Sequence, residues 1–308
     1  MTEIPIIERS PLTRSLRFEQ MDAYGNSIGF SISGALYEEQ TPFQNLKILQ
    51  SEEWGHLLIL DGEIQSASLD EALFNEIRAH VPFYAIDPTT TDKGLRALII
   101  GGGNGASLRE LLKHPEIQHV DLVEIDPRII AVCSEKMPEA NDRGRIFKDP
   151  RVQLHFQDGM DFLKDSKRRE GQYHVLLNDT THSTKHRGLA SAFHSQEFIR
   201  FASEALAPEG VFSLPLGTAR PGDSFIPDML EKIRNFFALA GLMKAHVPTF
   251  GLGFWTAAWA SQKTAVHRQS WETIDQRIHQ KPVSAKIYNT NAHFSSVRHD
   301  SWLAGMER

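Results

Sequence analysis

The sequence lacks the features that mark an extracellular or membrane protein. Its 308 residues include a single cysteine, Cys133, so no intramolecular disulfide can form and we expect a reducing environment. Cys133 falls in a predicted helix and is interpreted as a core residue, not a nucleophile. No apolar run approaches the roughly 18 residues that span a bilayer, and the first residues lack the charged-then-apolar order of a secretion signal. The predictions are a cytoplasmic location and no membrane partner.

An excess of positive charge is also missing. The formal net charge is −6, whereas a nucleic-acid-binding protein usually needs a basic face. Hydrophobic residues make up 41% and charged residues 23% of the chain, as is ordinary for a globular protein. We therefore expect a small-molecule substrate, no nucleic-acid partner, and one large domain or two modest ones.

What the sequence does contain is a glycine-rich turn between a predicted strand and a predicted helix. The apolar run over 95–100 shows no alternation and is typical of a buried parallel strand, and a helical pattern follows over 107–113. Between them stand Gly101, Gly103 and Gly105. Because glycine has no Cβ, the backbone there can adopt positive φ and approach a ligand at the start of the helix.

Acidic residues follow the next two predicted strands. The strand over 120–123 ends at Glu124, nineteen residues after Gly105, where the ribose hydroxyls of a bound nucleoside lie. The strand over 152–156 is followed by Asp158, which can accept a hydrogen bond from an adenine amino group, cap the next helix, or do both. The glycines fit both the dinucleotide fingerprint and its S-adenosylmethionine (AdoMet) version. The second acid favours AdoMet, because dinucleotide sites have no particular need for it.

Predicted strands and helices alternate from 95 to 215, the pattern of a doubly wound parallel sheet. Before this region the pattern over 44–68, with a tight turn at Asp61-Gly62, predicts a small antiparallel sheet. The interpretation is an α/β chain with an N-terminal β-domain over 1–69 and a Rossmann-like catalytic domain over 70–308. The mixed pattern of the first 35 residues predicts no element. Further expected elements are a helix over 70–80, a helix over 225–239, and strands over 244–248 and 253–261.

From about Thr41 to the carboxyl end, the chain resembles the spermidine synthase (polyamine aminopropyltransferase) family. The resemblance rests on the order and spacing of short motifs, each weak alone. These are Thr41-Pro-Phe-Gln44, Leu58-Ile-Leu-Asp61-Gly62 with Gln65, Asp70-Glu71 with Glu76 and His80, Gly101-Gly-Gly-Asn-Gly105, Val123-Glu124-Ile-Asp126, Asp158-Gly159, Tyr173-His-Val-Leu-Leu-Asn-Asp179, Leu206-Ala-Pro-Glu-Gly210, Pro248-Thr249, and Tyr288-Asn289 with His293. The resemblance implies a Rossmann-like AdoMet-dependent transferase fold behind the β-domain, assembled as a homodimer or homotetramer.

Position by position, the resemblance implies a nucleoside site and a catalytic acid. Glu124 would hold the ribose, Asp158 the adenine, and Gln44 would help to line the pocket. Asp179 matches the family's catalytic acid: the attacking amine must lose a proton before it displaces a carbon bonded to sulfonium, and a carboxylate can accept that proton. The other expected nucleoside-binding residues are Gly101, Gly103, Asn104 and Gly105. The co-substrate would be AdoMet or its decarboxylated form, and no metal is expected because no metal-ligand spacing is present.

The acceptor-binding positions depart from the family pattern. Aspartate is usual where this chain has Asn104, and tyrosine is usual where it has Phe74 and Phe250. The usual run Asp-Ser-Thr-Asp-Pro is Asp179-Thr-Thr-His-Ser here, so His182 replaces the second acid. The expected substrate-binding residues are Phe74, His182, Phe250 and the retained Gln65.

These departures predict an unusual amine acceptor in place of a diamine. The loop after Asp179 is also longer and more basic than usual, with Lys185, His186 and Arg187. The favoured function is the transfer of an aminopropyl or related alkyl group from AdoMet, decarboxylated or not, to a non-standard amine, with Asp179 as proton acceptor. Two alternatives stay open: an AdoMet-dependent methyltransferase on the same fold, and a non-catalytic nucleoside-binding regulator.

Overall fold

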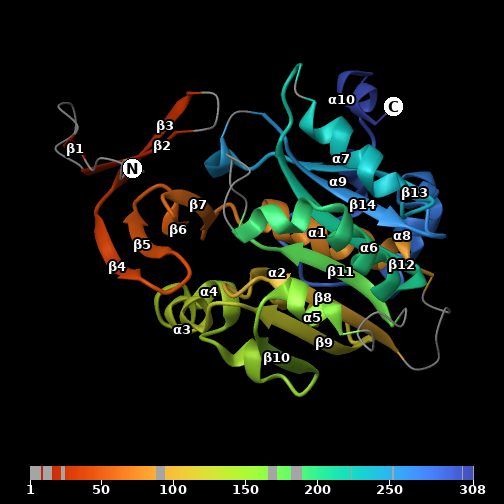
Figure 1. The fold of residues 1–308 in the computed structure, drawn as a ribbon, viewed down its shortest axis with the longest axis horizontal. Helices are drawn as coiled ribbons and strands as arrows, with labels where there is room; N and C mark the ends of the chain where they lie inside the picture. The colour runs from red at the N-terminus through yellow and green to blue at the C-terminus, as the bar shows by residue number, and fades with distance from the viewer. Residues whose placement is uncertain are drawn as a thin grey trace.

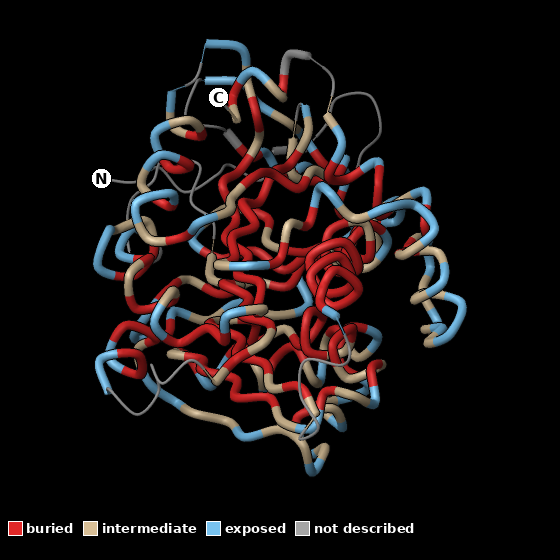
Figure 2. The backbone as a smooth tube through the Cα atoms, turned by 90° about the vertical axis from the view of Figure 1, so that its right-hand side faces the viewer, coloured by how far each residue is buried: buried red, intermediate tan, exposed pale blue. Residues whose placement is uncertain are grey.

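The computed structural model describes residues 8–9, 16–21, 25–87, 94–165, 172–181, 189–222, 224–251, 253–299 and 301–307. Within these ranges the chain forms two small sheets near the amino terminus and one large sheet covered by helices (Figure 1). Figure 2 shows that the buried stretches gather in the middle of the molecule and the exposed ones at its rim.

The two small sheets are antiparallel. One contains β1 (Glu8–Arg9), β2 (Leu16–Met21) and β3 (Ser27–Ile32); the other contains β4 (Gly34–Gln40), β5 (Asn45–Ser51), β6 (Gly55–Leu60) and β7 (Glu63–Ala67). Strands β6 and β7 are joined at Asp61 and Gly62, whose φ angles of 50° and 83° are the positive values that tight hairpin turns require. The predicted antiparallel β-region is confirmed, and it is larger than expected because β2 and β3 precede it.

The large sheet has seven strands in the order β10-β9-β8-β11-β12-β14-β13. They are β8 (Leu95–Gly101), β9 (Ile117–Glu124), β10 (Val152–Phe156), β11 (Tyr173–Asp179), β12 (Leu206–Thr218), β13 (Leu239–Ala245) and β14 (Trp255–Ser261). The first five in spatial order are parallel, and β14 is antiparallel to both of its neighbours. The predicted mostly parallel, doubly wound sheet is confirmed. Chain order reverses between β8 and β11, and in such sheets ligands bind at the carboxyl ends of the strands beside that reversal.

Helices cover both faces of this sheet. One face is covered by α1 (Ala72–Ala85), α2 (Ala106–Leu112), α8 (Trp271–Gln280) and α9 (Thr290–Val297). The other face is covered by α5 (Gly159–Lys164), α6 (Gln196–Ala205), α7 (Phe225–Arg234) and α10 (Ser301–Met306). Within the described part of the chain, no helix has the length and apolarity needed to cross a membrane.

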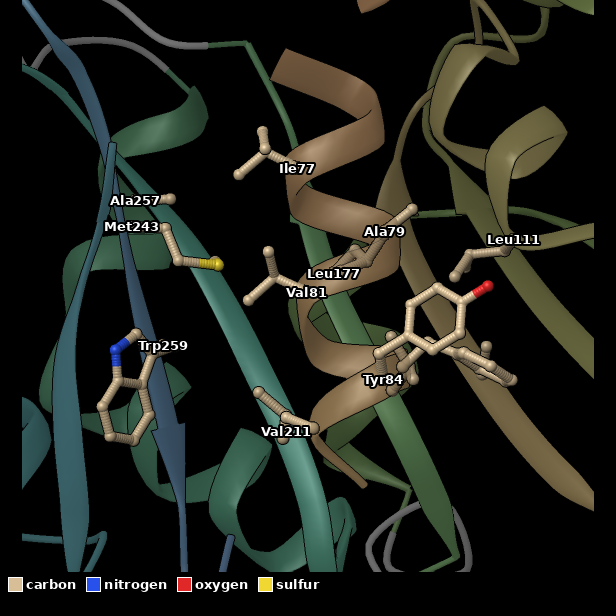
Figure 3. Packing of buried hydrophobic residues seen from close by; sticks show 14 of the residues in the cluster. Ile77, Ala79, Val81, Tyr84, Leu111, Leu177, Val211, Met243, Ala257 and Trp259 are labelled. Atoms are coloured by element: carbon tan, nitrogen blue, oxygen red, sulfur yellow. The ribbon is translucent and has the colours of Figure 1, made fainter. Parts of the chain in front are cut away.

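Helix α1 lies against the middle of the sheet and is buried along nearly its whole length. Figure 3 shows Ile77 and Val81 on the side that faces Met243 and Ala257 of β13 and β14. A helix in this position is expected to be apolar all round, since each face meets another element. The charged residues that α1 nevertheless carries must therefore have partners inside the protein.

Helix α3 (Pro127–Lys136), which follows β9 of the large sheet, packs against the small sheet of β4 to β7. Its Ile129 and Cys133, among others, pack with Leu46 and Leu58 of β5 and β6 in one buried cluster. Burial raises the pKa of the Cys133 thiol far above its usual value, as suits a core residue. The short α4 (Pro138–Asn141) follows α3. The domain boundary proposed between residues 69 and 70 falls between β7 and α1 and stays a prediction.

The helix predicted over 225–239 is shorter than expected. Helix α7 ends at Arg234, and β13 occupies Leu239–Ala245 where a strand was expected over 244–248. The apolar pattern misled because Phe236 and Phe237 continue it past the helix end while packing into the core from a turn. Hydrophobic periodicity reports burial, and here two phenylalanine side chains of the turn extend it.

Candidate active site

The carboxyl ends of neighbouring strands bring most of the predicted site residues to one edge of the sheet. Strand β9 ends at Glu124, β11 ends at Asp179, and Asp158 follows β10. Strand β8 leads into the glycine loop, residues 101–105. In this loop the Gly102 N–H donates to the main-chain oxygen of Asp179 (3.0 Å) and the Gly103 N–H donates to Glu124 Oε2 (3.0 Å). The loop therefore lies between the ribose acid and the catalytic acid that the sequence predicts.

The glycines of this loop are required by their surroundings. A Cβ on Gly102 would lie 2.9 Å from Asp179 Oδ2, and a Cβ on Gly103 would lie 2.8 Å from Glu124 Oε2. Gly101 and Gly105 have φ angles of 80° and 86°, which side chains disfavour. Larger residues would thus displace both acids, so the loop supports the site even before a ligand binds.

Glu124 is a buried carboxylate at the centre of this arrangement. Besides the bond from Gly103, its Oε1 accepts a hydrogen bond from the Asp126 N–H (2.9 Å). Burial raises the pKa of Glu124 to about 7, an effect that the two backbone donors oppose and the charges of Asp126 and Asp179 increase. The ligand-free protein therefore changes its charge at Glu124 close to neutral pH.

Nucleoside binding is expected to tighten about tenfold between pH 6 and pH 8. Ribose hydroxyls donate best to an ionised carboxylate, and below a pKa of about 7 the free protein holds Glu124 neutral, so binding at low pH must release a proton. Calorimetric titration with 5′-methylthioadenosine at several pH values measures this change. Glu124→Gln should bind with a pH-independent affinity, and Glu124→Ala should bind about 1–3 kcal/mol more weakly than wild type. A wild-type affinity that stays constant over this range would contradict the ribose assignment.

Gln44 is tied to the site through Asp126. Asp126 Oδ1 accepts from the Arg128 N–H (3.0 Å) and caps α3, while Oδ2 accepts from Thr41 Oγ1 (2.8 Å) and Gln44 Nε2 (3.0 Å). Gln44 is thus bonded to Asp126, which stands two residues after Glu124 in the chain, and its place beside the nucleoside stays a prediction. The role of Asp126 was not expected, although an Asp-Pro pair at the start of a helix is a recognisable capping signal.

Two residues predicted to touch the ligand also accept hydrogen bonds from N–H groups in the first turn of a helix. Asn104 Oδ1 accepts from the Ala106 N–H (3.0 Å), and Asp158 Oδ1 accepts from the N–H groups of Met160 (2.7 Å) and Asp161 (3.2 Å). These hydrogen bonds use one polar atom of each side chain. Asn104 Nδ2 and Asp158 Oδ2 are the atoms that a nucleoside ligand can use.

The sequence did not reveal that Asp179 contacts an arginine. Arg78 of α1 donates from Nη1 to Asp179 Oδ1 (2.5 Å) and from Nη2 to the main-chain oxygen of Asn178. The Arg78 side chain is 1% exposed, whereas that of Asp179 keeps 16%. A guanidinium is always charged in proteins, so the candidate catalytic acid has a permanent counter-charge. An arginine within a helix predicted to pack against the sheet was the signal that could have found it.

Phe74 and Phe250 lie together beside this ion pair. Their ring centres are 6.0 Å apart, and Trp255 packs at 5.7 Å from Phe74 and 4.8 Å from Phe250. The Arg78 guanidinium carbon lies 4.7 Å from the Phe74 ring centre, as expected for residues four apart on one helix face. Phe74, Phe250 and Trp255 thus form an aromatic wall next to the ion pair.

The other two predicted acceptor residues are Gln65 and His182. Gln65 is half-buried on β7, where its Nε2 donates to the main-chain oxygen of Glu63 (3.3 Å). Strand β7 packs against the short 3₁₀ helix η4 (Pro248–Phe250), which carries Phe250. His182 and the basic residues 185–187 lie outside the described residues.

Other charged residues, on α1 and just before it, hold the helix in place. The Glu76 carboxylate accepts hydrogen bonds from three consecutive backbone N–H groups, those of residues 286–288, at 2.7–2.9 Å. The further pairs are Asp70 with Thr249, Glu71 with Arg109, and His80 with Glu110 and His114. These contacts fix α1, and with it Phe74 and Arg78, against the sheet. Across the ranges that the structure describes, no group of three His, Cys, Asp or Glu side chains could hold a metal ion.

Comparison with known proteins shows which sequence families the chain matches. Residues 71–270, more than half of the chain, match the sequence profile described as "Spermine/spermidine synthase domain". The chain belongs to the spermine/spermidine synthase family. Residues 17–68 match a second profile, "Spermidine synthase tetramerisation domain". The resemblance seen in the sequence is therefore confirmed, and the protein is an enzyme of the aminopropyl-transferase type.

Relatives in this family align over nearly the whole chain. A polyamine aminopropyltransferase of Moorella thermoacetica is 32% identical over 279 residues, which cover 91% of each chain. That of Salmonella arizonae is 29% identical over 274 residues, 89% of this chain and 91% of the relative. A spermidine synthase crystallised with the transition-state analogue AdoDATO has a TM-score of 0.84 at 21% identity, covering 98% and 97% of the two chains. Thermotoga maritima spermidine synthase has a TM-score of 0.82 at 22% identity, covering 97% and 96%. The structural matches support the fold.

Proposed function

We propose that this enzyme transfers an aminopropyl or related alkyl group from AdoMet, decarboxylated or not, to an amine, with Asp179 as proton acceptor. The observation that supports this most directly is the position of Glu124 and Asp179 on opposite sides of one glycine loop, each within contact of a loop residue. A nucleoside bound through its ribose to Glu124 would present its sulfonium group near Asp179. A side chain at Gly102 would collide with Asp179, and one at Gly103 would collide with Glu124.

The chemistry assigned to this site is a nucleophilic displacement. The acceptor nitrogen attacks the carbon bonded to the sulfonium sulfur; a C–N bond forms, and the C–S bond breaks with its electron pair moving to sulfur. The product nucleoside is a neutral thioether. An amine must be unprotonated to attack, and Asp179 Oδ2, the oxygen that Arg78 does not bind, would accept its proton.

The acceptor is proposed to be an amine other than the common diamine. Phe74 and Phe250 supply rings without hydroxyl groups, and Arg78 compensates the charge of Asp179. A doubly protonated diamine such as putrescine therefore has little to bind it and is expected to be a poor substrate.

Product analysis tests the transfer directly. Incubation with each donor and a panel of amines should release 5′-methylthioadenosine if an aminopropyl or related group moves, and S-adenosylhomocysteine if a methyl group moves. Mass spectrometry distinguishes the two nucleosides. Release of neither product with any amine would refute transfer and favour a non-catalytic nucleoside-binding regulator.

The donor preference is expected to depend on Asn104. Its neutral amide removes an attraction for the ammonium of decarboxylated AdoMet and a repulsion for the carboxylate of AdoMet, to which Nδ2 can donate. We expect wild type to bind AdoMet at least as well as decarboxylated AdoMet, and Asn104→Asp to shift the ratio about tenfold toward the decarboxylated donor, about 1.4 kcal/mol. Titration of both donors into both proteins measures the ratio. A strong wild-type preference for decarboxylated AdoMet that the variant leaves unchanged would mean that Asn104 only shapes the loop.

We also propose that the chain assembles as a homodimer or homotetramer through its N-terminal β-region. Leu36 on β4 and Phe43 before β5 are exposed apolar side chains in this region, with 42% and 37% of their surface accessible. Both lie within the segment that matches the tetramerisation profile.

A further inference from the structure

Among the residues that the structure describes, the acceptor side of the site has no net formal charge. By acceptor side we mean Phe74, Arg78, Asn104, Asp179 and Phe250. Asp179 contributes one negative charge, and the guanidinium in contact with it contributes one positive charge. The other three residues are neutral, so within the described part of the site this ion pair is what balances a charge on the acceptor.

A diamine with two ammonium groups is badly matched to this arrangement. One ammonium can approach Asp179, whose charge is already shared with Arg78. The other would meet aromatic rings, and the guanidinium already lies against the Phe74 ring. An ammonium removed from water without a counter-charge is strongly disfavoured. A carboxylate close by, that of Asp70, has both oxygens bonded to Thr249 beside Phe250, and burial raises its pKa.

Arg78 has hydrogen-bonding capacity left over. Its contacts with Asp179 and Asn178 use Nη1 and Nη2, whereas Nε is buried and has no hydrogen-bond partner among the residues that the structure describes. Buried donors without partners are rare in native proteins, and a ligand is one way to satisfy them. The group best matched to a guanidinium edge is a carboxylate, which accepts two parallel hydrogen bonds.

We propose that the acceptor is an amine that also carries a carboxylate, and that Arg78 is the residue that selects it. The acceptor nitrogen lies at Asp179 Oδ2 and the carboxylate at the Nε edge of Arg78. A zwitterionic acceptor carries a positive charge that can pair with Asp179 and a negative charge that can pair with Arg78. The protein then needs no second acid to bind it. This inference rests on the proposed transfer and names its substrate class.

Three small amines of equal length test the selection. 1,4-Diaminobutane, 1-aminobutane and 4-aminobutanoate share one amino end and differ at the other, which is cationic, neutral or anionic. Their binding is measured by calorimetry on the full chain saturated with 5′-methylthioadenosine, and their conversion by mass spectrometry with each donor. We expect 4-aminobutanoate to bind at least tenfold more tightly than 1,4-diaminobutane, with 1-aminobutane between them.

Variants of Arg78 then assign the preference to this side chain. Arg78→Met keeps the length of the stem but removes the charge, and should shift the ratio at least tenfold toward the diamine. Arg78→Lys keeps the charge and should keep the order of the three amines. Arg200→Met is the matched control, because Arg200 forms an exposed ion pair with Glu204 on α6.

The outcomes separate this inference from the transfer itself. Failure of 4-aminobutanoate to bind, tighter binding of the diamine, or a ratio unchanged by Arg78→Met overturns the role of Arg78. If Arg78→Met does not fold, the wild-type order and that of Arg78→Lys decide. Preferred binding of 4-aminobutanoate without release of either nucleoside product would support charge selection and refute transfer.

Discussion

Replacing Asp179 with asparagine is expected to lower turnover at least a hundredfold and to leave nucleoside affinity within a few-fold of wild type. The amide keeps the shape of the side chain but cannot accept a proton, and a positioned proton acceptor typically contributes a factor of about 10²–10⁴. The ribose contact should survive, because Glu124 and the Gly103 N–H bond to each other independently of the Asp179 side chain. The rate of thioether release and calorimetry with 5′-methylthioadenosine measure the two effects.

Asp179→Asn also breaks the ion pair with Arg78, and the resulting loss of stability must be distinguished from the loss of turnover. In Asp179→Asn the buried guanidinium loses its counter-charge, and breaking a buried pair on one side costs about 3–5 kcal/mol. Arg78→Met combined with Asp179→Asn removes both charges and should recover most of that stability without recovering turnover. If the rate returned together with stability in the double variant, Asp179 would be a structural residue and not the proton acceptor.

Residues at strand ends were predictable because their signals are local. Glu124 follows an apolar strand at a fixed distance from the glycine loop, and in the structure it contacts that loop. Asn104 and Asp158 were also found from local pattern, each with an alternative: Asn104 only keeps the glycine turn, or Asp158 caps the next helix. Asp158 does cap α5, whereas Asn104 accepts a hydrogen bond from the Ala106 N–H without being the cap residue of α2. The ligand contacts of both residues stay predictions.

The role of Arg78 was not predicted, because that role depends on a residue distant in the sequence. Its partner Asp179 lies 101 residues away in the chain, and the two meet only because α1 packs across β11. The same holds for Gln44 and Asp126, which are 82 residues apart and join the small sheets to the large one. Motif spacing can nominate such residues, but their partners follow from how the sheets and helices pack.

The amino-terminal strands were missed for a different reason. Strands β2 and β3 have six residues each, and polar residues interrupt their apolar pattern. One of these, Gln20, is buried and accepts a hydrogen bond from the Ile64 N–H of β7, which no sequence pattern would indicate. Short strands with polar residues whose side-chain contacts lie in another sheet leave too weak a signal to predict alone.

The second large expected effect is on stability, at Glu76. Its carboxylate, 1% exposed, accepts three backbone N–H bonds: Lys286 to Oε1 at 2.7 Å, and Ile287 and Tyr288 to Oε2 at 2.9 Å each. In Glu76→Gln one oxygen becomes an amide NH₂, which would face at least one of these donors. Bonds to charged groups contribute about 1.5–3 kcal/mol, and a buried donor left unpaired costs about 1–3 kcal/mol. We therefore expect Glu76→Gln to lose about 3 kcal/mol of unfolding free energy.

Chemical denaturation of Glu76→Gln beside Glu231→Gln measures this loss, because Glu231 is exposed on α7 and its substitution should change little. Glu76→Gln should also weaken acceptor binding and nucleoside binding to different extents. Helix α1 carries Phe74 and Arg78 but not Glu124 or the glycine loop, so loosening its anchor should weaken acceptor binding more than nucleoside binding. A variant as stable as wild type would show that α1 is held by its apolar packing alone. Equal losses of affinity for acceptor and nucleoside would show that α1 does not position the acceptor side in particular.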